Sequence, residues 1–527
     1  MPSDERPNFL LFITDQHRAD HLGCYGNGVV RTPRIDALAE SGWTSDEFYT
    51  ATPICMPNRA SLFTGRMPSR HGVRHNGIEL SFAERTLPQA LREAGYATVH
   101  VGKSHLQNIE VKPPQVPPPG QPRRSHEARQ EPAGRHGQEI WRRWEDDPAC
   151  EIELPYYGFD AVDLSIHHAD EQYGHWRRWI RAQVENADSL IGPDHAVPAP
   201  EFKLTRIRQA WRTRVPERLY PTSWIADRTI AHLRRLSGAT QPFFLVCSFP
   251  DPHHPFTPPG RFWSMFKPED VPAPPSFHAA HGTLPPHLAW LYARRADGTA
   301  VRNTQMLFAC SEREGREAIA LNYGSLACID EAVGRVLDAL DDGGLRRNTV
   351  VIFTSDHGDF LGDHQLLLKG PIHYRGLIRV PFIWHEPGGS ARRSRALAQT
   401  IDIAPTVLER AGVEPWNGIQ GASLLPLVQG AGEPVRDAVL IEEEGQRYYM
   451  GFRDRVRMRT LLDGRYRLSV YDGVDWGELY DLAEDPDELR NLWDEARARS
   501  VRTALAERIT RKMIALSETS PYPTRIA

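Results

Sequence analysis

The residues best suited to chemistry lie in one short segment, Cys55-x-Pro57-x-Arg59, which is followed by a short apolar run and Gly65. Pro57 is tolerated in the first turn of a helix, and Gly65 is a typical C-terminal stop. Cys55 would then lie at the positive end of the helix dipole, one turn away from Arg59. Such a position can bind an anion and do chemistry on it. A buried structural cysteine beside a surface arginine is the alternative interpretation.

The spacing Cys-x-Pro-x-Arg, with its tail Ala-Ser-Leu-Phe-Thr-Gly-Arg, resembles the signature of the sulfatase family. The resemblance implies that Cys55 is converted after translation to formylglycine, an aldehyde whose hydrate is the nucleophile. It also implies a partner, the machinery that generates formylglycine. The match extends over nearly the whole chain, from Asp15 to Leu492, because other motifs of the family follow in order.

Two apolar runs end in residues that could bind a metal ion. Residues 8–14 are followed by Asp15 and Gln16, and residues 349–354 lead into Asp356 and His357. A continuous apolar run is typical of a buried parallel strand, and functional residues collect at the carboxyl ends of such strands. Taken alone, an Asp in this place is more often a helix cap or a turn former.

The sulfatase resemblance implies instead that these four residues hold one divalent cation, with residue 55 completing the shell. Carboxylate and amide oxygens suit Ca²⁺, whereas the imidazole of His357 favours Mn²⁺ or another transition metal. We therefore expect Mn²⁺ or Ca²⁺ as the cofactor, together with formylglycine.

Basic residues follow two further predicted strands. Lys103 and His105 come after residues 97–101, and His253 comes after residues 243–249. By itself Gly-Lys-x-His is a weak signal that usually marks a solvated turn. The resemblance implies that Lys103, with Arg59 and Lys369, stabilises the anionic transition state. It implies that His253, with Lys369, protonates the departing alcohol, and that His105 takes a proton from the formylglycine hydrate.

Other polar residues remain ambiguous from the sequence. Asn76 precedes a glycine, so it either contacts the sulfate or makes the turn that Asn-Gly favours. His167, His168 and His175 could reach the substrate, but we interpret them as surface residues.

The motifs point to two branches of the family. Gln16 and His357 resemble the metal sites of phosphonate monoester hydrolases and choline-sulfatases. Lys103 and His105 follow ordinary sulfatases, because phosphonate monoester hydrolases carry Tyr and Thr there. We expect arylsulfatase-type hydrolysis of a small-molecule sulfate monoester to an alcohol and inorganic sulfate. The alternatives are a phosphonate monoester hydrolase or phosphodiesterase on the same site, an enzyme doing both, and a non-catalytic anion-binding relative with an unmodified Cys55.

The elements that carry these residues predict an α/β fold. The resemblance implies a large, mostly parallel central sheet sandwiched by helices, like that of alkaline phosphatase. Residues 1–430 would form this catalytic domain, with residues 110–150 as a Pro- and Arg-rich loop or lid. Residues 431–527 would form a smaller antiparallel sheet with a helix, since residues 457–470 alternate about Asp463-Gly464.

Composition and charge limit the classes of partner that the protein could bind. Of the residues, 40% are hydrophobic and 25% charged, as in a soluble globular protein. The net charge of −5 argues against nucleic-acid and anionic-membrane binding. The N-terminal apolar run is too short for a signal peptide or a membrane span. Scattered cysteines without a framework spacing fit a reducing compartment, so we expect a cytoplasmic protein. The tail beyond residue 500 could mediate a homo-oligomer.

Overall fold

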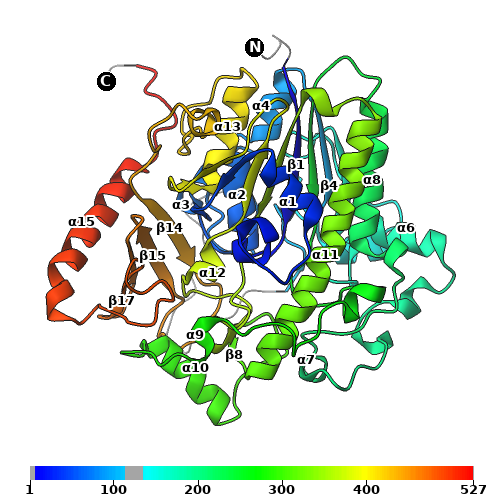
Figure 1. Cartoon of the computed structure of the whole chain (residues 1–527). Coiled ribbons are helices and arrows are strands. Elements are labelled where there is room, and N and C mark those ends of the chain that lie inside the picture. Colours follow the sequence, from blue (N-terminus) through cyan, green and yellow to red (C-terminus); the bar gives the residue numbers. More distant parts are fainter. Residues whose placement is uncertain (1–5, 113–134, 526–527) are drawn as a thin grey trace.

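The computed structural model describes residues 6–112 and 135–525, and its centre is a nine-stranded sheet (Figure 1). The strand order is β12-β2-β11-β9-β1-β7-β4-β5-β6. In chain order these strands are β1 (Asn8–Thr14), β2 (Trp43–Ser45), β4 (Ala97–Gly102), β5 (Ala161–Ile166), β6 (Tyr173–Gly174), β7 (Phe243–Ser248), β9 (Thr349–Ser355), β11 (Phe382–His385) and β12 (Arg392–Ser394). The neighbours β9, β1, β7, β4 and β5 run parallel, whereas β11 and β6 pair antiparallel. The predicted mostly parallel sheet is confirmed.

Helices cover both faces of this sheet, which explains why polar and apolar residues do not alternate along β1. Leu10 and Phe12 of β1 pack in one core with helices α8 (Pro221–Leu236) and α11 (Glu312–Asp342). Phe9, Leu11 and Ile13 point to the opposite core, which includes α2 (Cys55–Thr64), α4 (Leu87–Glu93) and α13 (Ile403–Arg410). Since every side chain of β1 is buried, the strand reads as a continuous apolar run.

The carboxyl ends of the central strands are held in register beyond the last ladder residues. The backbone N–H of Asp15 donates to Asp251 O at 3.2 Å, and that of Asp356 donates to Thr14 O at 3.1 Å. The N–H of Lys103 donates to Ser248 O at 3.0 Å. The loops after β1, β4, β7 and β9 are thereby fixed to one another at the edge where parallel strands collect functional residues.

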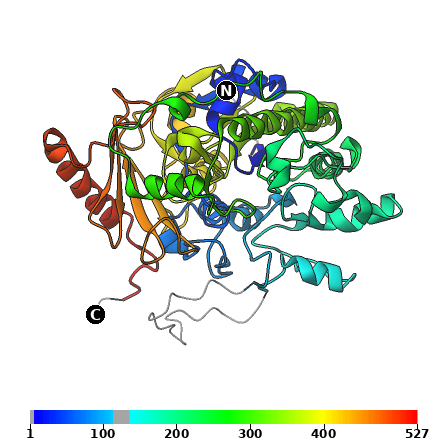
Figure 2. The ribbon, with the colours of Figure 1, turned by 90° about the horizontal axis from the view of Figure 1, so that it is seen from below.

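The C-terminal part forms a second, antiparallel sheet, as predicted. It consists of β14 (Val439–Glu444), β15 (Arg457–Leu462), β16 (Tyr466–Tyr471) and β17 (Gly477–Asp481). Helix α15 (Arg499–Ala515) packs on its outer face (Figure 2). On the inner face, Ile441 and Tyr480 share a core with Phe360 and Tyr374 of the larger part.

The other α-helices and strands of the described chain are short. They are α1 (Pro33–Glu40), β3 (Phe48–Tyr49), α3 (Pro68–His71), α5 (Trp141–Asp146), α6 (His175–Gln183), α7 (Lys203–Arg206), α9 (Pro275–His278), α10 (Pro286–Ala296), β8 (Phe308–Ala309), β10 (Leu366–Leu367), α12 (Arg375–Ile378), β13 (Ala398–Gln399) and α14 (Leu425–Gln429). Within the two described ranges, every helix is too short or too polar to cross a membrane.

Two predictions on domain organisation receive no test. Most of the loop or lid predicted for residues 110–150 falls on residues 113–134, which lie outside the described residues. Its end includes α5, whose Trp144 is buried. The domain boundary at residue 430 stays a prediction.

Candidate active site

Residue 55 lies at the first turn of α2, at the carboxyl edge of the central sheet. The helix begins at Cys55, and Gly65 ends it in the left-handed conformation with φ +65°. The N–H of Met56 donates to Asn76 Oδ1 at 3.1 Å, so Asn76 caps the helix from outside. Cys55 itself is buried. The predicted helix, with the cysteine at its positive end, is confirmed.

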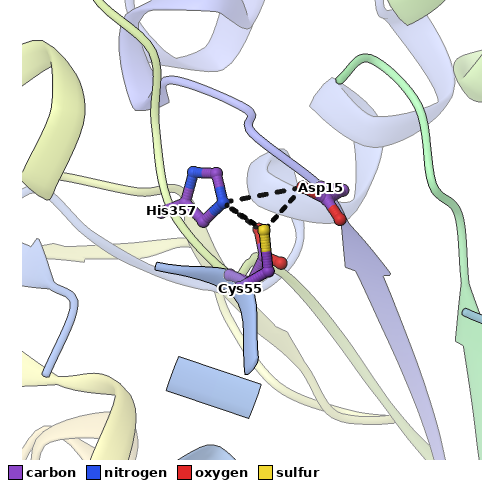
Figure 3. Close-up of side chains that lie close together, drawn as sticks. Asp15, Cys55 and His357 are labelled. Atoms are coloured by element: carbon purple, nitrogen blue, oxygen red, sulfur yellow. Dashed lines mark hydrogen bonds and ion pairs between the residues drawn. The ribbon is translucent and has the colours of Figure 1, made fainter. Parts of the chain in front are cut away.

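The buried ligand atoms of Asp15, Asp356 and His357 converge on Cys55. Figure 3 shows Asp15 and His357 beside the cysteine. His357 Nε2 lies 3.1 Å from Cys55 Sγ and 3.6 Å from Asp15 Oδ1, and Asp15 Oδ1 lies 3.9 Å from the sulfur. Asp356 Oδ1 lies 3.7 Å from His357 Nε2. Two carboxylate oxygens and one imidazole nitrogen, all withdrawn from solvent, are a donor set that fits a single divalent cation.

Arg59 holds the outer oxygen atoms of both carboxylates. Its Nε donates to Asp356 Oδ2 at 2.8 Å, and its Nη2 lies 3.4 Å from Asp15 Oδ2. Each carboxylate therefore turns one oxygen to the guanidinium and the other toward Cys55. Burial raises the pKa of Asp15, but Lys103 and Arg59 outweigh it and hold that pKa far below its usual range. Asp15 is ionised at neutral pH.

Lys369 reaches the same cluster from the other side. Its Nζ lies 3.1 Å from Cys55 Sγ, 3.0 Å from Gln16 Oε1 and 2.8 Å from His253 Nε2. The Gln16 amide is fixed because its Nε2 donates to Asp359. The ammonium group thus contacts three of the predicted ligand residues, because Nζ also lies 3.2 Å from His357 Nε2.

The charges around Cys55 favour its ionised form. Burial and the Asp15 carboxylate raise the pKa of the thiol, but Lys369, Lys103 and His357 outweigh them and lower it. A site that stabilises a thiolate equally stabilises another anion at this position.

A stack of imidazole rings lies beside Lys103. The ring centroid of His253 is 3.7 Å from that of His168 and 4.2 Å from that of His254. Lys103 donates to Asp15 Oδ2, and its Nζ lies 2.6 Å from His168 Nε2. Burial, followed by His168 and Lys369, lowers the pKa of His253 well below its usual value, so this ring is neutral at neutral pH.

His105 is buried nearby in a left-handed conformation with φ +56°. Its backbone N–H donates to the buried Glu139 carboxylate at 2.8 Å, and Tyr156 donates to the other oxygen of that carboxylate at 2.5 Å. Burial, with Lys103 and Arg59, lowers the pKa of His105 well below its usual value. In the described ranges no hydrogen bond joins His105 to Cys55.

The structure therefore brings together the predicted Asp15, Gln16, Cys55, Arg59, Lys103, His253, Asp356, His357 and Lys369. Asn76 contacts the backbone beside Cys55, and its side chain is only partly buried.

Three residues of the site escaped sequence reasoning. The surface interpretation of His168 is wrong, because the residue is only 3% exposed and contacts Lys103. It follows β5, so the rule that function collects at strand ends could have located it. Asp359 positions Gln16, and Asn58 donates from its Nδ2 to the backbone oxygen of Asp356. Asp359 and Asn58 each lie inside a motif, and no feature of the sequence singles out either residue.

Comparison with known proteins agrees with this geometry. The Sulfatase family model matches residues 7–413, and a model of the C-terminal part of N-sulphoglucosamine sulphohydrolase matches residues 362–515. An arylsulfatase of Clostridium perfringens is 29% identical over 502 residues, which cover 92% of this chain and 90% of the relative. The multifunctional alkaline phosphatase superfamily protein PehA of Trinickia caryophylli is 27% identical, with 92% and 91% covered.

Among solved structures, the phosphonate monoester hydrolase of Agrobacterium radiobacter superimposes with a TM-score of 0.76 at 26% identity. The match covers 99% of this chain and 98% of that chain. With the family model spanning most of its length and the cysteine motif at the edge of an alkaline-phosphatase-like sheet, the chain belongs to the sulfatase family and is a sulfuric ester hydrolase.

Proposed function

We propose that this enzyme hydrolyses sulfate monoesters of the arylsulfatase type with one divalent metal ion and a formylglycine made from Cys55. The observation that carries the proposal is the convergence of Asp15 Oδ1, Cys55 Sγ and His357 Nε2 in a buried cluster beside Lys369 Nζ. Asp15, Asp356 and His357 would hold the cation, with the amide oxygen of Gln16. Once present, the two groups supply a hydrated aldehyde as nucleophile and a Lewis acid that lowers its pKa.

The protein's own side chains would bind and orient the sulfate group. Arg59 is fixed by two carboxylates, and its planar fork of donors suits an oxyanion. Lys103 is fixed by Asp15 and His168. Because these cations are already oriented when substrate arrives, they stabilise developing negative charge without reorganising.

Lys369 and His253 would supply the proton for the departing alcohol. His253 donates from Nδ1 to the backbone oxygen of His254, so its Nε2 accepts from Lys369 Nζ. Burial lowers the pKa of Lys369, but Cys55, Asp15 and Asp356 outweigh it and raise that pKa, and the two carboxylates remain after Cys55 is converted. The transferable proton of the pair therefore resides on Lys369, next to the neutral imidazole.

His105 would serve as the base of the second half of the reaction. It is neutral at neutral pH, and within the described chain its Nδ1 has no hydrogen-bond partner. A neutral imidazole with an uncommitted nitrogen can accept a proton there. Asn76 would contact the substrate only at the outer edge, since its side-chain oxygen is used by Met56.

A phosphonate monoester or phosphodiester is the second candidate substrate. The His357 ligand and the Gln16 position favour it, as does the similarity to the phosphonate monoester hydrolase and to PehA. The imidazole ligand also supports Mn²⁺ over Ca²⁺.

The cellular setting is part of the proposal. All the cysteines are free, and five of them are buried, which supports a reducing compartment such as the cytoplasm. Conversion of Cys55 would require the formylglycine-generating machinery to act before folding buries the residue.

A substrate panel tests the proposed function. The protein is checked by mass for formylglycine at residue 55 and loaded in turn with Mn²⁺ and Ca²⁺. The values of kcat/KM are then compared for an aryl sulfate, an aryl phosphodiester and an aryl phosphonate monoester. The highest value is expected for the sulfate with Mn²⁺. A higher value for either phosphorus ester would place the enzyme with the phosphonate hydrolases.

A further inference from the structure

His168 makes two contacts to groups that act on the substrate, although it belongs to no motif of the sequence. Its Nε2 lies 2.6 Å from Lys103 Nζ, and its ring lies face to face with that of His253, at a centroid distance of 3.7 Å and an interplanar angle of 16°. The side chain is buried, with 3% of the residue exposed.

The tautomer of His168 follows from its partner. The Lys103 ammonium only donates hydrogen bonds, so His168 Nε2 accepts and the ring proton lies on Nδ1. Lys103 also donates to Asp15 Oδ2. Two of its three N–H groups are thereby committed, and the direction of the third is fixed.

The backbone holds His168 in place under strain. His167 and Ala169, on either side, have φ values of +89° and +55°, in the left-handed region that non-glycine residues rarely adopt. Such strain persists where the surrounding structure enforces it, and it clusters at functional sites. Here it turns His168, the second residue after β5, inward to Lys103.

We propose that His168 is a positioning residue, which orients Lys103 toward the bound sulfate through Nε2 and backs the ring of His253. The inference rests on the proposed function, because it assigns His168 to the same anion site. Lys103 gains its fixed direction from a neutral acceptor, so no second negative charge is placed near the substrate.

Four variants separate the hydrogen bond from the ring. His168→Gln places an amide oxygen where Nε2 was, whereas the shorter His168→Asn cannot reach Lys103. His168→Phe keeps a ring against His253 without the acceptor. His195→Asn is the control, because His195 is exposed and has no hydrogen bond to Lys103 among the described residues.

Activity is measured as kcat/KM on aryl sulfates with leaving groups of different pKa. The Asn and Phe variants should lose about tenfold to hundredfold, which is what a lost hydrogen bond to a charged group is worth. For the Phe variant the factor should be the same for every leaving group, because Lys103 acts on the sulfate. The Gln variant should recover most of the loss, and the control should match the wild type.

Binding of inorganic sulfate, measured by calorimetry on the same proteins, needs no turnover. It should weaken in the Asn and Phe variants and recover in the Gln variant. Wild-type activity and sulfate affinity in all of them, or a Gln variant no better than Asn, would overturn the role of His168. A wild-type protein that binds sulfate but turns over no sulfate ester would overturn the proposed function alone. Thermal midpoints and the mass at residue 55 check that each variant is folded and converted.

Discussion

Two clusters of buried charge lie in different parts of the molecule, and they are built in opposite ways. The catalytic-edge cluster comprises Asp15, Arg59, Lys103, Asp356 and Lys369, at the carboxyl ends of the central strands. The C-terminal ion network comprises Arg467, Glu478 and Glu488, under the small antiparallel sheet. All of these residues except Lys369 are less than 3% exposed.

In the C-terminal ion network every charged atom has a hydrogen-bond partner, and we call such a network closed. Arg467 donates from Nε to Glu488, from Nη1 to Ser469 Oγ at 2.8 Å, and from Nη2 to Glu478 at 3.2 Å. The remaining carboxylate oxygens accept from the Tyr471 hydroxyl and from the backbone N–H of Arg375. Each charged atom has a partner, so the network can stabilise the fold but has nothing left to offer a ligand.

The catalytic-edge cluster is open, because polar atoms around it lack hydrogen-bond partners in the described part of the chain. Three buried imidazole nitrogens around it, His105 Nδ1, His168 Nδ1 and His254 Nε2, have no hydrogen-bond partner within the described ranges. It also holds three permanent cations against two carboxylates. Burial of charge alone therefore does not mark an active site. Among the described residues, unpartnered buried atoms also occur elsewhere, such as both imidazole nitrogens of His100 on β4 and the Tyr480 hydroxyl beside Arg467. The excess of cations is what distinguishes the catalytic-edge cluster, because it suits an anionic ligand.

Removal of the proposed nucleophile should have the largest effect. Cys55→Ala should reduce kcat for aryl sulfates by at least about 10⁴-fold, the scale seen when an enzyme loses its nucleophile. The measurement is initial-rate kinetics with the mass of the peptide across residue 55. Cys328→Ala, a buried cysteine on α11, is the control and should keep wild-type kcat. Retention of most activity by the Cys55 variant would refute the mechanism.

Breaking the closed network should affect stability and leave the chemistry intact. Arg467→Met strands two buried carboxylates, so the free energy of unfolding should fall by about 3–5 kcal/mol. It is measured by urea denaturation, with kcat/KM determined on the folded fraction. Arg465→Met is the control, because its guanidinium is exposed and solvent screens its bridge to Asp481. A loss of kcat/KM in the folded Arg467 variant would show that the two clusters are coupled.

Removing a cation from the catalytic-edge cluster should lower activity and leave stability intact, which is the reverse of the effect of the Arg467 substitution. Lys369→Met should lower kcat by about 10²–10³-fold, the range for loss of one preorganised stabilising group. The thermal midpoint should not fall, since the substitution removes a charge from a site with excess cations. Lys267→Met, at an exposed position, is the control. If the midpoint drops as far as in the Arg467 variant, then Lys369 is a structural residue.

Many of the residues in this comparison could be predicted from the sequence. Continuous apolar runs predicted the central strands, and the residues after them gave Asp15, Lys103, His253 and Asp356. The hairpin about Asp463-Gly464 was also predictable, because alternation and turn chemistry agree there. In these places a local pattern determines a local structure.

The rest depends on contacts between distant segments. Arginine is usually exposed, and nothing in its neighbourhood marks Arg467 as buried. Its partner Glu488 lies beyond the hairpin, after β17. His168 is turned inward by two left-handed residues that are not glycine, a conformation no sequence pattern announces. Both were hidden because their partners meet only in the folded chain.

Asp251 lies next to the catalytic-edge cluster, but its own hydrogen bonds are satisfied, as in the C-terminal ion network. Its substitution should have the smallest effect of those predicted here. Its backbone oxygen accepts from Asp15, but its carboxyl oxygens already accept from Thr222 Oγ1 at 2.7 Å and from Tyr220 at 3.4 Å. It is thus closed, like the C-terminal ion network, and Asp251→Asn should leave kcat nearly unchanged. Burial raises the pKa of Asp251 to about 7.

The folded protein therefore keeps a proton on Asp251 between about pH 4 and pH 7 that the unfolded chain has released. That linkage makes wild-type stability fall as pH rises through this interval and level off above it. Asparagine does not titrate, so from pH 5 to pH 8 the free energy of unfolding of Asp251→Asn should gain about 2 kcal/mol relative to the wild type. Thr222→Val removes a donor that lowers this pKa, and should move the levelling to higher pH. Urea denaturation at several pH values measures both, and a difference between Asn and Asp that is independent of pH would show that Asp251 is ionised in the folded protein, like Asp15.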